Sequence, residues 1–183
     1  MKKIFAVMVL NAFLASSAFA DDVKIGILLG FTGPIESLTP DMASGAELAI
    51  KEASDSGAFM GGSRILSVRG DSTCVDAAAA TATAERLITS DGVSAIMGAD
   101  CSGVTTAVLQ NVATAKGVVM ISPSATSPAL STIEDNGLFF RTSPSDARQG
   151  QVLAQILKEK SIKSAAMSYT NNDYGKGLAD SIQ

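Results

Sequence analysis

Histidine is absent from the 183-residue sequence. Its absence removes the commonest general base and the commonest neutral metal ligand. Neither a G-x-S-x-G nucleophile motif nor a Walker A phosphate loop occurs, and Gly26, Gly30 and Gly33 do not have the spacing of a dinucleotide-binding fingerprint. Asp71 and Asp100 are candidates for an acid–base pair, but Asp is a common turn former, and we favour turn roles for both. We therefore expect a protein that is not an enzyme, with no cofactor and no metal.

Basic residues are neither numerous nor clustered. Lys and Arg number 14 against 18 Asp and Glu, which gives a formal net charge of −4. Recognition of phosphate backbones needs clustered Lys and Arg side chains. The sequence therefore argues against nucleic acid as a partner. Aromatic residues make up only 5% of the chain, which suits small-residue helices packed closely on a sheet.

The first 20 residues contain the three parts of a secretory signal peptide. Lys2 and Lys3 form a basic region, residues 4–14 form an apolar region, and residues 18–20 read Ala-Phe-Ala, an A-x-A cleavage pattern. The apolar run is shorter than the roughly 20 residues that cross a bilayer, which disfavours a membrane anchor. We expect cleavage after Ala20, location in the periplasm and no membrane span in the mature chain. The mature protein would have roughly 160 residues and a net charge of about −6.

Strand and helix patterns alternate along the rest of the chain. A continuous apolar run typical of a buried strand occupies residues 23–29, and further strands are expected at 64–69, 93–97, 118–121, 138–141 and 165–169. Helices with apolar positions at helical spacing are expected at about 39–57, 76–88, 102–116, 145–157 and 174–183. Such strands, separated by amphipathic helices, predict an α/β fold with a parallel sheet and helices on both faces. The sequence stops within the last predicted helix, so we expect a fragment of a longer protein.

Small polar loops follow the predicted strands. In open parallel sheets, ligands bind at the carboxyl ends of the strands beside helix N-termini. Ser102 would begin a helix, where free N–H groups and the helix dipole favour an anion such as a carboxylate, and Ser124 and Thr126 add hydroxyl groups at the next strand end. The alternatives are an ordinary helix cap for Ser102 and turn chemistry for Ser124 and Thr126. The two loops together favour a binding site.

Two cysteines are present, Cys74 and Cys101. An exported chain meets an oxidising compartment, in which an even pair readily forms a disulfide. Two buried thiols are the alternative. We favour the disulfide, which would stabilise the fold by about 3 kcal/mol.

Seven motifs together resemble the leucine/isoleucine/valine-binding proteins of the type I periplasmic-binding family. In order along the chain they are VKIGILLGFTGP, GAELAIKEAS, DSTC, MGADCS, ISPSATSP, FFRTSPSDARQG and NNDYGKGLA. The resemblance implies two similar α/β lobes that close on a ligand held between them. It divides the chain into a signal peptide at 1–20, an N-terminal ligand-binding lobe at 21–160, and the start of a second, truncated lobe at 161–183.

The resemblance also implies roles for individual residues. Ser102 matches a serine that binds the ligand carboxylate. Ser124 matches a position whose carbonyl receives the α-ammonium, and Ala125 lies beside it in the same ligand-binding loop. Thr126 matches a threonine that contacts both groups. Tyr174 is similar to a second-lobe tyrosine that reaches across the cleft.

Cys74 and Cys101 match the disulfide pair of the same family. Leu38 departs from it, because an aromatic residue near this position usually covers the ligand side chain, and the side-chain preference stays open. The resemblance implies a monomer that captures a branched-chain or similar small amino acid and delivers it to an ABC permease in the inner membrane. The alternatives are a ligand-sensing domain of the same fold, or binding of another small carboxylate or amide.

Overall fold

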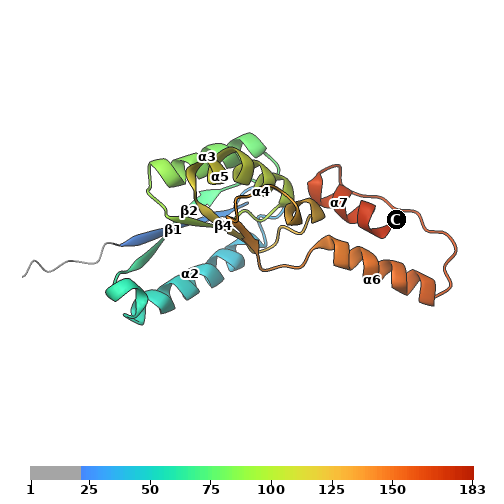
Figure 1. Ribbon diagram of the computed structural model, residues 1–183, viewed down its shortest axis with the longest axis horizontal. Helices are drawn as coiled ribbons and strands as arrows, with labels where there is room; N and C mark the ends of the chain where they lie inside the picture. Colours follow the sequence, from blue (N-terminus) through green and yellow to red (C-terminus); the bar gives the residue numbers. More distant parts are fainter. Residues whose placement is uncertain (1–21) are drawn as a thin grey trace, which may run out of the picture.

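The structure, a computed structural model, describes residues 22–183 and is built around one parallel sheet (Figure 1). The predicted signal peptide at 1–20 lies outside the described residues. The five strands are β1 Val23–Leu29, β2 Ile65–Asp71, β3 Ala95–Gly98, β4 Val119–Ser122 and β5 Phe139–Arg141. They lie in the order β2-β1-β3-β4-β5, and every neighbouring pair is parallel. The predicted α/β fold with a parallel sheet is confirmed.

Helices follow the strands along the chain, and those that precede β5 cover the two faces of the sheet. They are α2 Thr39–Asp55, α3 Ala77–Thr89, α4 Ser102–Val108, α5 Thr114–Lys116, α6 Asp146–Glu159 and α7 Asp173–Ile182. Short turns occur at Phe59–Gly61 and Pro128–Ser131, and a π-helical turn at Leu109–Ala113 joins α4 to α5. The helix predicted at 102–116 is therefore one helical segment with a wider turn in its middle.

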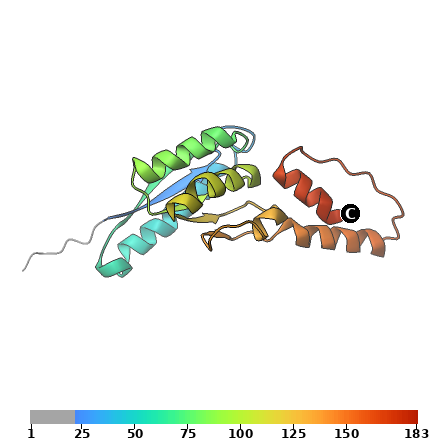
Figure 2. The same cartoon turned by 45° about the horizontal axis from the view of Figure 1, so that its top comes forward.

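The alternation of β1 side chains divides the core into two layers. Leu28 packs with α3 and the α4–α5 segment on one face, while Ile27 and Leu29 pack against α2 on the other. All three side chains are fully buried, because successive side chains of a strand point to opposite faces and both faces here carry helices. Figures 1 and 2 show α2 on the side of the sheet opposite to α3 and α4.

The chain from α6 onwards departs from the sequence prediction. Residues 165–169, expected to form a strand, have no regular structure, and their side chains are exposed. The prediction of a strand there is wrong for this structure, because a strand needs a hydrogen-bonded neighbour and the sheet ends at β5, which pairs only with β4. Helices α6 and α7 pack on each other beyond the carboxyl ends of the strands (Figures 1 and 2).

A glycine accounts for the close packing of α6 on α7. Gly150 lies in α6, and a Cβ atom there would collide with the backbone carbonyl of Ser181 in α7.

Between residues 22 and 183, none of the helices combines the length and the apolarity that a bilayer crossing requires.

Candidate functional site

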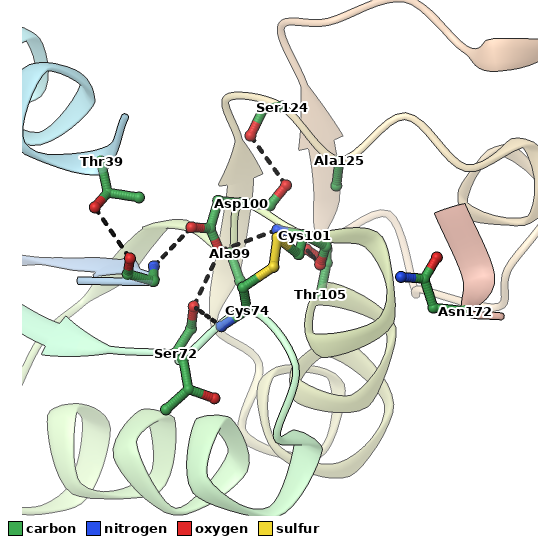
Figure 3. Close-up of a disulfide and its surroundings, with 12 residues drawn as sticks. Thr39, Ser72, Cys74, Ala99, Asp100, Cys101, Thr105, Ser124, Ala125 and Asn172 are labelled. Carbon is green, nitrogen blue, oxygen red and sulfur yellow. Dashed lines mark hydrogen bonds between the residues drawn. A yellow bond between two sulfur atoms is a disulfide. The ribbon is translucent and has the colours of Figure 1, made fainter. Parts of the chain in front are cut away.

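A disulfide joins two loops at the carboxyl edge of the sheet (Figure 3). Cys74 follows β2 and Cys101 follows β3, and their Cα atoms are 5.2 Å apart. Because β1 lies between β2 and β3, the disulfide bridges the loops on either side of the end of β1. Gly30 lies directly after β1, and a Cβ atom on it would be 3.2 Å from the Cβ atom of Cys74. The predicted disulfide is confirmed. Because Cys74 lies so close to residue 30, there is little room for a side chain there, which accounts for Gly30.

Asp100 organises the loops around this disulfide. Its carboxylate, which is 2% exposed, accepts hydrogen bonds from the N–H of Gly30 at 2.6 Å and the hydroxyl of Ser72 at 2.9 Å. It also accepts from the N–H of Cys101 at 3.0 Å. Three loops are therefore tied to one carboxylate, and Asp100 has the turn-forming role that the sequence favoured over general acid–base chemistry.

Asp71 has a similar role at the end of β2. Its carboxylate accepts a hydrogen bond from the Thr32 hydroxyl at 2.6 Å and another from the Thr73 N–H at 2.9 Å. Partial burial raises the pKa of Asp71, but the hydrogen bonds from Thr32 and Thr73 together outweigh burial and bring the pKa below its usual value. Asp71 therefore fixes the loop after β1 to the loop after β2.

A cleft of about 890 Å³ opens beside the disulfide. Its walls come from the loop after β1, the starts of α2, α3, α4, α6 and α7, and the loop after β4. Four of the residues implied by the family resemblance line this cleft, namely Ser102, Ser124, Thr126 and Tyr174. The fifth, Ala125, is fully buried and does not line it. The loops near 102 and 124–126 thus converge on one space, the geometry that an anion site at these positions requires.

Hydrogen bonds between the two loops hold this convergence in place. Ser102 is 2% exposed, and its Oγ atom accepts a hydrogen bond from the N–H of Ser127 at 3.1 Å. The hydroxyl of Ser124 donates to the backbone carbonyl of Asp100 at 2.9 Å (Figure 3). The two serines therefore connect the start of α4 with the loop after β4 as well as lining the cleft.

Asp146 is a cleft residue that the sequence analysis did not identify as one. It is the first residue of α6, is 3% exposed, and accepts a hydrogen bond from the Thr126 hydroxyl at 2.8 Å. Its N–H donates to the backbone carbonyl of Thr126 at 2.9 Å. In the sequence it is an ordinary acidic residue at the start of a helix, next to the cap Ser145, and no sequence signal indicates its contact with Thr126, 20 residues earlier.

Part of the cleft lining is apolar. Ile35, Leu38, Met42 and Val75 belong to it, and Leu38 and Val75 are 56% and 67% exposed. The polar and apolar walls together suit a small ligand with a charged end and an apolar end.

The ionisable side chains that line the cleft are three aspartates and a tyrosine. They are Asp100, Asp146, Asp173 and Tyr174. No Lys or Arg is among the lining residues in the described part of the chain. Within residues 22–183 there is also no cluster of three or more side chains suited to hold a metal ion.

The family model for periplasmic binding proteins matches residues 22–183, and the chain belongs to that family. It is 32% identical over 171 residues to the Leu/Ile/Val-binding protein of Citrobacter freundii, covering 93% of this chain and 45% of that protein. It is 31% identical over 184 residues to the leucine-, isoleucine-, valine-, threonine- and alanine-binding protein of Pseudomonas aeruginosa, covering 100% of this chain and 48% of that protein.

Solved structures show the same architecture. The branched-chain amino acid transporter substrate-binding protein of Streptococcus pneumoniae, in complex with isoleucine, superposes with a TM-score of 0.77 at 32% identity, over 87% of this chain and 45% of that one. A solute-binding protein of Rhodopseudomonas palustris in complex with 4-hydroxybenzoate gives 0.76 at 22% identity, over 88% and 42%, and shows the fold alone. The chain spans about half the length of the relatives it matches. The relatives are binding proteins, in keeping with the non-enzymatic role predicted from the sequence.

Proposed function

We propose that the protein is the periplasmic substrate-binding component of an ABC importer and captures a branched-chain or similar small amino acid. The observation that carries the proposal is the convergence of Ser102, Thr126 and Asp146 in one cleft that also has apolar lining residues. Membership in the periplasmic-binding family and the names of the relatives support the same class of ligand.

The start of α4 is the proposed site for the ligand carboxylate. The first N–H groups of a helix have no partner within the helix, and together with the helix dipole they attract an anion. Ser102 begins this segment, which continues in helical form to Lys116, and Thr126 lies in the adjoining wall. The Thr126 hydroxyl donates its proton to Asp146, so the neutral donors proposed for the negative end of the ligand are backbone N–H groups and the Ser102 hydroxyl.

Asp146 is the proposed partner of the α-ammonium group. Its carboxylate is almost fully buried and lies next to Thr126, so a ligand held by Thr126 would place its ammonium group within reach. A purely anionic ligand such as a benzoate would instead meet Asp146 and Asp173 with no cation lining the cleft. The charges of the cleft therefore favour a zwitterion, and the apolar wall around Leu38 favours an aliphatic side chain.

The packing of the last two helices suggests where the lobes meet. The family resemblance implies a first lobe at residues 21–160, but α6 packs on α7, away from the sheet. We therefore place the end of the first lobe before α6 and assign α6, residues 161–183 and the cleft residue Tyr174 to the second lobe. Closure around a ligand would bring the two lobes together, because the ligand contacts both.

Export by the signal peptide at 1–20, existence as a monomer and delivery to a membrane permease complete the proposed role. The second candidate is a ligand-sensing domain of the same fold, in which the same cleft controls a receptor. A permease and an ATPase encoded beside the gene would support transport. A signalling domain joined to this chain would support sensing instead.

Calorimetry of the full-length mature protein, with both lobes present, tests the proposed ligand class. L-Isoleucine, L-leucine and L-valine should release or absorb heat, whereas benzoate should give none. Asp146→Asn should weaken isoleucine binding by roughly tenfold or more, because a hydrogen bond to a charged group contributes about 1.5–3 kcal/mol. Asp180→Asn is the matched control, since Asp180 is exposed on α7 and does not line the cleft. An absence of heat with every α-amino acid would refute the proposal.

A further inference from the structure

Arg141 holds the loop after β4 from behind the cleft. It is the last residue of β5, and its Nη1 atom donates to the backbone carbonyls of Ala125 at 3.2 Å and Ser127 at 2.8 Å. Its Nη2 atom donates to the Ser131 hydroxyl. One guanidinium group therefore fixes three points of a loop that lines the cleft, although Arg141 itself does not line it.

These contacts determine the direction of the Thr126 N–H. In a trans peptide unit the carbonyl and the N–H point to opposite sides. The Ala125–Thr126 peptide is trans, and its carbonyl points to Arg141. The N–H of Thr126 is consequently directed away from Arg141, and Thr126 is the residue of this loop segment that lines the cleft between the buried Ala125 and Ser127.

The positive charge of Arg141 lies close to Thr126 and to the Asp146 carboxylate. Partial burial lowers the pKa of its guanidinium, and the nearby carboxylate of Asp146 acts in the opposite direction. Asp146 in turn accepts the Thr126 hydroxyl. Arg141, at the end of β5, therefore restricts the backbone around Thr126, and Asp146, at the start of α6, restricts the Thr126 hydroxyl.

We propose that Arg141 is a positioning residue for ligand binding, because its hydrogen bonds to the carbonyls of Ala125 and Ser127 turn the Thr126 N–H towards the ligand carboxylate. This inference rests on the proposed amino-acid binding function. It adds a residue outside the cleft that determines how well the cleft binds the anionic end of the ligand.

Substitution of Arg141 in the full-length mature protein tests the inference. Arg141→Met should weaken L-isoleucine binding by roughly ten- to a hundredfold at a temperature at which circular dichroism shows the variant to be folded. Arg141→Lys should recover part of the affinity, because one ammonium group cannot engage two carbonyls and a hydroxyl in the fixed fork of a guanidinium. Arg148→Met, which removes the same charge from an exposed position on α6, should bind as the wild type does.

Amide resonances give a readout that separates positioning from mere stability. In the wild type and in Arg148→Met, titration with L-isoleucine should shift the Thr126 amide resonance. In Arg141→Met that shift should be small, and the resonance should already differ before ligand is added. A purely structural role would lower the melting temperature but leave the affinity of the folded molecules and the Thr126 shift unchanged.

The outcomes distinguish this inference from the proposed function. If the wild type binds isoleucine and folded Arg141→Met binds it equally well, the inference is overturned and the function stands. If the wild type binds no amino acid, the function fails and the inference fails with it. Should Arg141→Met not fold, Arg141→Lys decides, and wild-type affinity in that variant overturns the inference.

Discussion

Removal of the Cys74–Cys101 disulfide should lower the stability of the protein by a predictable amount. The two cysteines are 27 residues apart in sequence, and the loop-entropy relation for a crosslink of this size gives about 3.5 kcal/mol at 25 °C. This value is an upper bound, because Thr73 and Cys74 have positive φ angles of 58° and 67°. Release of the crosslink lets both residues leave that unfavourable region and offsets part of the loss.

Urea unfolding with and without a reductant measures the effect. The chain has no tryptophan and only two tyrosines, so far-ultraviolet circular dichroism is the suitable signal. With an m-value of about 2 kcal/mol/M, reduction should lower the urea midpoint by up to roughly 1.7 M. A Cys74→Ser/Cys101→Ser variant should match the reduced wild type and show no response to the reductant. Equal midpoints for the oxidised and reduced wild type would show that the loop-entropy argument is wrong for this protein.

Two further predictions concern Asp71 and Gly150. The pKa of Asp71 is lower in the folded state than in the unfolded state, so its contribution to stability is present above about pH 4 and is lost as the pH falls through the folded-state pKa. Asp71→Asn should therefore unfold at lower urea concentration at pH 7, and the difference from the wild type should narrow in acid; a constant difference from pH 7 to pH 3 would contradict this. Gly150→Ala should speed amide hydrogen exchange in α7 and leave the sheet unchanged, because the new methyl group collides with Ser181. Unaltered exchange in α7 would mean that the two helices are not held at the distance described.

The sequence predicted the sheet well because its signals are local. β1, β3 and β4 are built around short apolar runs bounded by turn residues, and the helices between the strands have apolar residues at helical spacing. The pairing of Cys74 with Cys101 was also accessible, since the chain has only two cysteines and an apparent export signal. These features require no knowledge of distant contacts.

The errors and omissions concern contacts between distant parts of the chain. Residues 165–169 have the composition of a strand, but strand formation depends on a neighbour that a local pattern does not reveal. Asp146 reads as an ordinary residue at a helix start until the fold brings it to Thr126. Ala125 lies within the predicted ligand-binding loop, but its side chain is buried and its carbonyl accepts a hydrogen bond from Arg141. Each of these depends on tertiary structure.

The absence of Lys and Arg from the cleft lining within residues 22–183 bears on how the proposed complex would respond to ionic strength. Dissolved salt screens interactions between exposed full charges, whereas hydrogen bonds from helix-end N–H groups act over a few ångströms, and the proposed Asp146–ammonium pair involves a carboxylate that is 3% exposed and therefore little screened. We therefore expect the affinity of such a cleft for an amino acid to be nearly the same in dilute and in concentrated salt. That property suits a protein exposed to a medium whose composition the cell does not control.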